Sequence, residues 1–98
     1  MSAKDRIEID FARAINQAES LEEMAGILSS MAKESFEEAL LKVAGIWRGD
    51  NADFFRERGV DIIPGILMTA DELMRVAGNV RYTAQVVYEA EKRAAGLI

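Results

Sequence analysis

The stretch GIWRGDNADFF, residues 45 to 55, interrupts an otherwise helical pattern near the midpoint of this 98-residue chain. It contains the only Trp, Trp47, and Gly45 and Gly49 lie close on either side. A residue that ends a helix and reverses the chain often needs a positive φ, which Gly adopts without steric cost. The stretch therefore predicts a turn at residues 47–51 between two helices. Taken alone, Trp47 is interpreted as a hydrophobic plug at the end of a bundle.

A helical pattern precedes this turn, because apolar residues recur there at alternating spacings of four and three. Ser2 and Asp5 have the spacing of a capping box, so a helix is predicted from about residue 3 to about residue 46. Small residues at every second position of the face would let a neighbouring helix approach closely. The face consists of Ile7, Phe11, Ala14, Ala18, Leu21, Ala25, Leu28, Ala32, Ser35, Ala39 and Ile46, with Lys42 as its one charged interruption.

The same pattern resumes after the turn and predicts a second helix over about 52–96, with Asp50 or Asn51 as its N-cap. The predicted face consists of Ala52, Phe55, Gly59, Ile62, Ile66, Ala70, Leu73, Ala77, Val80, Ala84, Val87, Glu91 and Ala94.

Pro64 and Gly65 lie inside this second helix. An interior Pro removes one backbone hydrogen bond and clashes with the preceding turn, so a kink or a break is expected there. Thr69 and Glu72 repeat the capping-box spacing, which leaves open a helix that restarts at about Ala70. We favour the kink over the break.

Two long helices joined by a short turn predict an all-α fold, an antiparallel helical hairpin forming one domain. Each helix also carries apolar residues beside its main face, and a lone hairpin would leave them in water. Dimerisation into a four-helix bundle is therefore predicted, with a homodimer preferred and a heterodimer left open. The predicted dimer or partner interface consists of Ile15, Met24, Leu28, Met31, Phe36, Leu40, Phe55, Ile66 and Leu73.

The composition argues against catalysis and nucleic-acid binding. The net charge is -5, which repels phosphate backbones, and the chain has neither Cys nor His. Thiolate nucleophiles, imidazole bases and the usual zinc ligands are thus missing. The carboxylate pairs Glu22-Glu23 and Glu37-Glu38 are adjacent on a helix and point about 100° apart, so neither converges on a substrate. We predict no enzyme, no metal and no cofactor.

Nothing in the sequence predicts a Sec-type signal or a membrane span. The first ten residues alternate charged with apolar positions, and the runs Met24–Ala32 and Ile62–Ala70 are far shorter than the roughly 20 residues that cross a bilayer. We expect a soluble chain without stable membrane insertion. The polar faces are rich in acids rather than in Lys and Arg, which argues against disruption of anionic membranes.

The chain resembles the WXG100 family, small helical proteins exported by type VII (Esx-type) secretion systems. The resemblance is carried by the length, the acidic Cys-free composition, the central Trp47-Arg48-Gly49, and Ala52 and Phe55 in the order W-x-G-x-x-A-x-x-F. It covers the whole chain. It implies a dimer with antiparallel hairpins that is made in the bacterial cytoplasm, exported without a Sec signal peptide and associated with virulence.

The resemblance also implies a bipartite secretion signal, formed by the W-x-G turn and by a Tyr followed four residues later by Asp or Glu. Here Tyr88 matches the Tyr, but the acid, Glu91, follows at three and Lys92 stands at four. Either Glu91 substitutes, or the chain depends on a partner that carries the intact signal. The predicted signal residues are Trp47, Gly49, Tyr88 and Glu91.

Two functions follow as expectations. The first is a secreted substrate or export partner of a type VII system, recognised by the secretion ATPase and acting by protein–protein interaction. The alternative is a cytosolic helical adaptor or chaperone that pairs with a larger type VII substrate and covers one of its helices with the apolar face.

Overall fold

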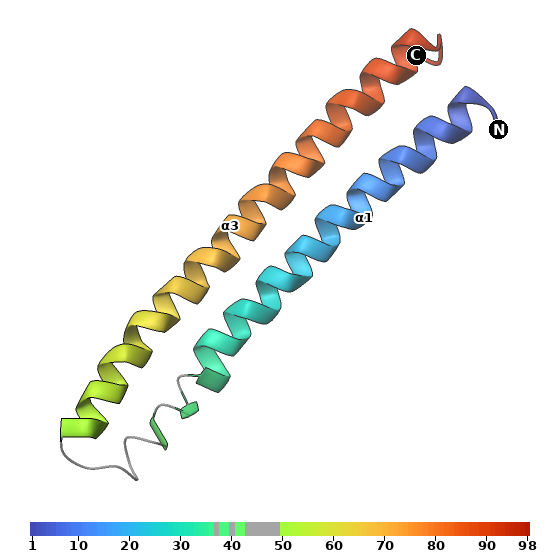
Figure 1. The fold of residues 1–98 in the computed structure, drawn as a ribbon. Helices are drawn as coiled ribbons and strands as arrows, with labels where there is room; N and C mark the ends of the chain where they lie inside the picture. Colours follow the sequence, from blue (N-terminus) through green and yellow to red (C-terminus); the bar gives the residue numbers. More distant parts are fainter. Residues whose placement is uncertain (37, 40, 43–49) are drawn as a thin grey trace. The chain divides into compact units, whose positions relative to one another are not determined.

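The computed structural model describes residues 1–36, 38, 39, 41, 42 and 50–98, and these residues are almost entirely helical (Figure 1). Helix α1 spans Ala3–Ser30, a π-helix follows at Met31–Phe36, and helix α3 spans Asp50–Ala94. The described residues include no strand. The predicted all-α helical hairpin is thereby confirmed, and the four-helix bundle stays a prediction.

The capping box predicted at the N-terminus is present at the start of α1. The Asp5 backbone N–H donates to Ser2 Oγ over 3.1 Å, and the Ser2 N–H donates back to Asp5 Oδ2 over 3.4 Å. These reciprocal bonds satisfy backbone donors that have no partner within the first helical turn. The helix therefore begins at Ala3 because its first donors are occupied by side chains.

The π-helix was not anticipated, because the apolar spacing before the turn predicted one continuous helix over residues 3–46. Helix α1 ends at Ser30, and the π-helix at Met31–Phe36 is wound more widely. Residues 38, 39, 41 and 42 are α-helical again. A π segment inserts a residue into the helix and shifts the face that follows it. It directly follows the pair Ser29-Ser30, whose hydroxyls compete with helical backbone hydrogen bonds. Residues 43–46 of the predicted helix lie outside the described residues.

Helix α3 continues through Pro64, so the structure differs from the alternative in which the helix breaks and restarts near Ala70. Thr69 is an interior residue rather than a cap, since its hydroxyl donates to the Gly65 carbonyl one turn earlier over 3.1 Å. The helix begins at Asp50, which is two residues earlier than predicted. Packing and the remaining backbone bonds thus outweigh the one donor that Pro64 lacks.

The C-terminal end of α3 is closed by a Schellman motif. The Leu97 N–H donates to the Lys92 carbonyl over 2.8 Å, and the Gly96 N–H donates to the Arg93 carbonyl over 3.0 Å. Gly96 has a φ of 73°, a conformation that L side chains disfavour and Gly adopts freely. Lys92 and Arg93 also place positive charge in the last turn, where the helix dipole favours it.

The chain divides into two compact units, each built from parts of both helices. The first unit comprises Met1–Glu23 and Leu73–Ile98, and the second comprises Met24–Glu72. In the first unit α1 and α3 run antiparallel, because early residues of α1 contact late residues of α3. Both chain termini lie at the same end of this unit (Figure 1).

The interior of the first unit is made mainly of alanines. Ala18 is fully buried at 0% exposed, and Ile7, Ala77 and Ala84 are buried with it. All four belong to the predicted faces, which confirms the periodicity. Near the end of α3 the face shifts by one position, since Val87 is 46% exposed while Tyr88 is half-buried. A straight helix has 3.6 residues per turn and drifts away from a 3.5-residue pattern in this way.

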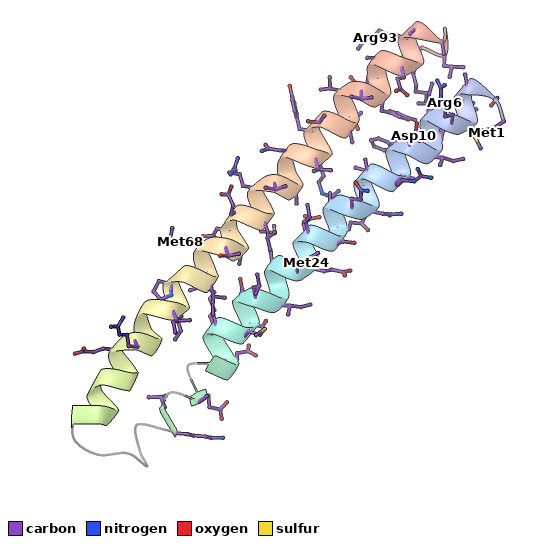
Figure 2. The ribbon with its side chains drawn as sticks, viewed as in Figure 1. Met1, Arg6, Asp10, Met24, Met68 and Arg93 are labelled. Atoms are coloured by element: carbon purple, nitrogen blue, oxygen red, sulfur yellow. The ribbon has the colours of Figure 1, made fainter. Side chains whose placement is uncertain are left out.

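The second unit has the same kind of interior, with Ala25, Ala32 and Ala70 buried. Small interior residues leave long side chains on its surface, and Met24 and Met68 extend from their helices in Figure 2. The exposed large apolar residues described in this unit are Met24, Ile27, Met31, Leu41, Ile62 and Met68.

Candidate functional site

Tyr88 is the centre of a side-chain cluster that joins α1 to α3 near the chain termini. Its hydroxyl donates to Glu8 Oε1 over 2.6 Å and accepts from Lys92 Nζ over 3.0 Å. Lys92 Nζ also lies 3.4 Å from Glu8 Oε1, which closes the triangle. The Tyr88 ring packs on the Phe11 ring with centroids 4.4 Å apart. We refer to Glu8, Phe11, Tyr88 and Lys92 as the Tyr88 cluster.

Helix geometry accounts for the cluster. Tyr88 and Lys92 are four residues apart and therefore neighbours on the surface of α3, and Glu8 and Phe11 are three apart on α1. The Lys92 ammonium lies 4.8 Å from the Tyr88 ring centroid, close enough for attraction to the ring face. The cluster thus exists only because two helices bring their pairs together.

The charged members of the cluster stabilise each other's ionised forms. The pKa of Glu8 is lowered from 4.5, mainly by the hydrogen bond from Tyr88, which outweighs the raising effect of burial. The hydrogen bond and charge of Lys92 and the charge of Lys4 lower it further. The pKa of Lys92 is raised from 10.5 by its hydrogen bond to Tyr88 and by Glu8. At neutral pH the cluster therefore contains a carboxylate and an ammonium joined through a phenol.

A second polar link joins the two helices on the same side. Arg81 Nε donates to Glu22 Oε1 over 3.2 Å, and Arg81 Nη2 donates to the same oxygen. This hydrogen bond and the charge of Glu22 raise the pKa of Arg81. Residues spaced by seven, or by a multiple of seven, share one side of a helix. Glu22 therefore lies on the same side of α1 as Glu8, and Arg81 lies on the same side of α3 as Tyr88. We call this side of the first unit the polar flank.

The first unit also contains a groove of about 410 Å³, and Phe11 and Tyr88 of the Tyr88 cluster are among the residues that line it. Asp10, Phe11 and Ala14 line it from α1, and Val80, Thr83 and Val87 are among the residues that line it from α3. Asp10 lies near the chain termini (Figure 2). We call it the apolar groove, because Ala, Val and Phe make up much of its lining. The carboxylates of Asp10 and Glu91 lie beside these apolar side chains.

Of the four predicted signal residues, Tyr88 and Glu91 are both half-buried, and both line the apolar groove. Tyr88 also belongs to the Tyr88 cluster. Among the interactions of the described residues, none joins Glu91 to the Tyr88 hydroxyl. Trp47 and Gly49 lie outside the described residues. Tyr88 and Glu91 therefore share a groove, but the hydrogen bonds of the Tyr88 hydroxyl go to Glu8 and Lys92.

The predicted interface residues show a range of exposure. Met24 is 49% exposed and Met31 is 48% exposed, in keeping with a surface position. Ile15, Leu28, Ile66 and Leu73 are half-buried, and Ile15 shares the side of α1 that carries Glu8 and Glu22. Leu40 lies outside the described residues, as do the side chains of Phe36 and Phe55. The interface role of the whole set stays a prediction.

Sequence reasoning missed Glu8 and Lys92 as members of a site with Tyr88, and it missed Glu22 and Arg81 as an interhelical pair. Each of these residues reads as an ordinary charged surface position. A usable signal was present in the heptad spacing of Glu8 from Ile15 and Glu22, and of Arg81 from Tyr88. This spacing predicts contacts between the helices only when the register of α1 against α3 is known.

Within the described residues there is no group of three or more acidic, Cys or His side chains arranged to hold a metal ion. The described helices also include none whose length and apolarity would suit it to crossing a membrane.

A comparison of the chain with protein-family models, with curated proteins and with solved structures finds no match.

Proposed function

We propose that this chain is a WXG100-like substrate or export partner of a type VII secretion system, and that it acts by protein–protein interaction. The observation that carries the proposal is the apolar groove on a two-helix unit whose interior consists mainly of alanines. Such a unit buries little of its large apolar surface by itself. A further helix packed into the groove would cover it.

The exposed apolar residues support the same proposal. Val87 lines the groove at 46% exposed, and the second unit exposes Met24 and Met31 to a similar extent. Contiguous exposed apolar surface marks sites of protein–protein interaction, and each unit offers such residues to a partner. In the proposal the partner is a second copy of the chain, giving a four-helix bundle, and a related WXG100 protein is the alternative partner.

The export part of the proposal rests on the resemblance in the sequence. Trp47-Arg48-Gly49 stands between the two helical halves of the chain, and Tyr88 follows near the end of α3. In this proposal the chain is made in the bacterial cytoplasm and leaves without a Sec signal peptide. Trp47 and Tyr88 then serve recognition by the secretion ATPase.

The test is export of an epitope-tagged chain from a bacterium with an active type VII system. We expect the protein in the culture medium, and we expect it to be retained in cells that lack the secretion ATPase or that express the Trp47→Ala variant. Release that is independent of the ATPase would contradict the proposal. Retention in the cells in complex with a larger exported protein would instead favour the adaptor or chaperone function.

A further inference from the structure

We propose that Glu8, on the opposite helix, supplies the acidic side chain of the recognition site around Tyr88. This inference rests on the proposed export function and specifies which residues form the recognised surface. It replaces a linear signal on α3 with a composite site made from both ends of the chain.

Tyr88 and Glu8 are brought together by the pairing of α1 and α3. One turn after Tyr88 on α3 stands Lys92, which is a cation. Glu91 lines the apolar groove together with Tyr88, but among the described residues it makes no hydrogen bond to the Tyr88 hydroxyl. Among the described residues, the carboxylate hydrogen-bonded to the Tyr88 hydroxyl belongs to Glu8, at 2.6 Å. The phenol and the carboxylate are thus paired in space although they are 80 residues apart in sequence.

The two charged side chains of the cluster differ in their exposure to an approaching partner. The Glu8 side chain is 44% exposed, whereas the Lys92 side chain is only 19% exposed. An approaching protein therefore contacts the carboxylate of Glu8 more readily than the ammonium of Lys92. Lys92 holds the phenol and the carboxylate together and so acts as a positioning residue.

The contacts of Tyr88 restrict the motion of its side chain. Tyr88 is held by two hydrogen bonds and by its contact with the Phe11 ring. A recognition site fixed in this way loses little conformational entropy on binding. Because Glu8 and Phe11 come from α1, the site forms only where α1 and α3 are paired. Export would then depend on a folded chain end rather than on an unstructured tail.

The experiment compares full-length variants in the export assay described above. Glu8→Gln removes the charge at Glu8 while keeping its size, and Tyr88→Ala removes the phenol. We expect each to reduce the exported fraction by about tenfold, the effect of losing a charged hydrogen bond to a partner. Glu91→Gln should reduce export less than Glu8→Gln does, since Glu91 makes no hydrogen bond to the Tyr88 hydroxyl among the described residues.

A structural role for Glu8 is separated from a recognition role by a matched control. Glu22→Gln removes an interhelical partner of Arg81 on the same flank but leaves the Tyr88 cluster intact. It should be exported normally, with helical circular dichroism and thermal stability recorded for every variant. If Glu22→Gln reduces export as much as Glu8→Gln does, loss of helix pairing explains the effect and the inference is overturned.

A rescue experiment tests the position of the acid directly. The double variant Glu8→Ala with Lys92→Glu moves the carboxylate onto α3, one turn after Tyr88. We expect it to recover most of the export that Glu8→Ala loses. Absence of recovery, in a double variant that keeps its helical content, would count against an acid at this position as the recognised group.

The failures of the two proposals can be told apart. If Tyr88→Ala and Trp47→Ala are both exported like wild type, the proposed function fails, and this inference fails with it. If Tyr88→Ala is retained while Glu8→Gln is exported and Glu91→Gln is retained, the function stands. In that case the signal is linear on α3 and the role of Glu8 is refuted.

Discussion

At the scale of single residues, Tyr88 connects helix pairing to charge. Its hydroxyl both donates to Glu8 and accepts from Lys92, so one side chain links an anion and a cation from different helices. The Phe11 ring packs against its aromatic ring. Because these contacts favour ionised Glu8 and ionised Lys92, the stability of the chain ends should depend on pH.

The lowered pKa of Glu8 predicts a loss of stability in acid. A carboxylate whose pKa is depressed below 4.5 on folding contributes fully above about pH 4.5, and the contribution disappears as the pH falls through the folded pKa. The raised pKa of Lys92 acts oppositely, with its contribution lost only above about pH 10.5. Between about pH 5 and pH 3, the thermal midpoint of wild type should fall more steeply than that of Glu8→Gln, as followed by circular dichroism. Parallel curves would contradict this prediction.

Ala18 illustrates a residue whose size is fixed by packing. It is 0% exposed between the helices of the first unit, and a larger side chain has no room there. We expect Ala18→Leu to lower the free energy of unfolding by about 1–3 kcal/mol, as overpacking typically does. Ala12→Leu adds the same atoms at an exposed position of α1 and should change it by less than about 0.5 kcal/mol. Urea denaturation of both variants measures the difference, and equal effects would contradict the packing explanation.

At the scale of elements, α3 persists although it contains residues that weaken helices. Pro64 lacks an N–H, and Gly65 and Gly78 lie in its interior. The sequence correctly predicted where α1 begins, because Ser2 and Asp5 cap it locally. It did not predict the π-helix at Met31–Phe36, and it favoured a helix that continues through Pro64 while leaving a break open. Both outcomes depend on contacts along the helix that local propensity does not contain.

Substitution of Gly78 tests how much an interior glycine lowers the stability of α3. No heavy atom lies within 4 Å of a Cβ placed at Gly78, so alanine fits there without collision. We expect Gly78→Ala to raise the free energy of unfolding by about 0.5–1 kcal/mol through better helix propensity. Urea denaturation provides the measurement, and a loss of stability would indicate that another chain packs closely against this glycine.

Gly96 supplies the opposite case within the same helix. A Cβ at Gly96 also meets no neighbour within 4 Å, but the φ of 73° disfavours any L side chain. Gly96→Ala should therefore lower the free energy of unfolding by about 1 kcal/mol, in the same urea experiment. A neutral result would mean that the Schellman motif contributes little to the stability of the fold.

At the scale of the whole molecule, the central question is what covers the apolar groove. Val87 and Val86 form a matched pair, because they are adjacent, chemically identical and 46% and 48% exposed, and only Val87 lines the groove. If a second copy packs into the groove, Val87→Asp buries an unpaired carboxylate and should weaken association by at least about tenfold. Val86→Asp should leave it unchanged. Light scattering across a concentration series, with helical content recorded, distinguishes the two, and equal behaviour would exclude the groove as the contact.

The sequence by itself determined the helical character of the chain, the capped start of α1 and the alanine faces buried in each unit. These features are set by local hydrogen bonding and by the 3.6-residue period, which any single helix reveals. The tertiary structure decided that Tyr88 rather than Val87 packs between the helices, and that Glu8 rather than Glu91 is its acidic neighbour. Periodicity identifies the inward face of a helix, but it does not give the rotation and register of one helix against another. Those follow from how large and small side chains interlock across the pair.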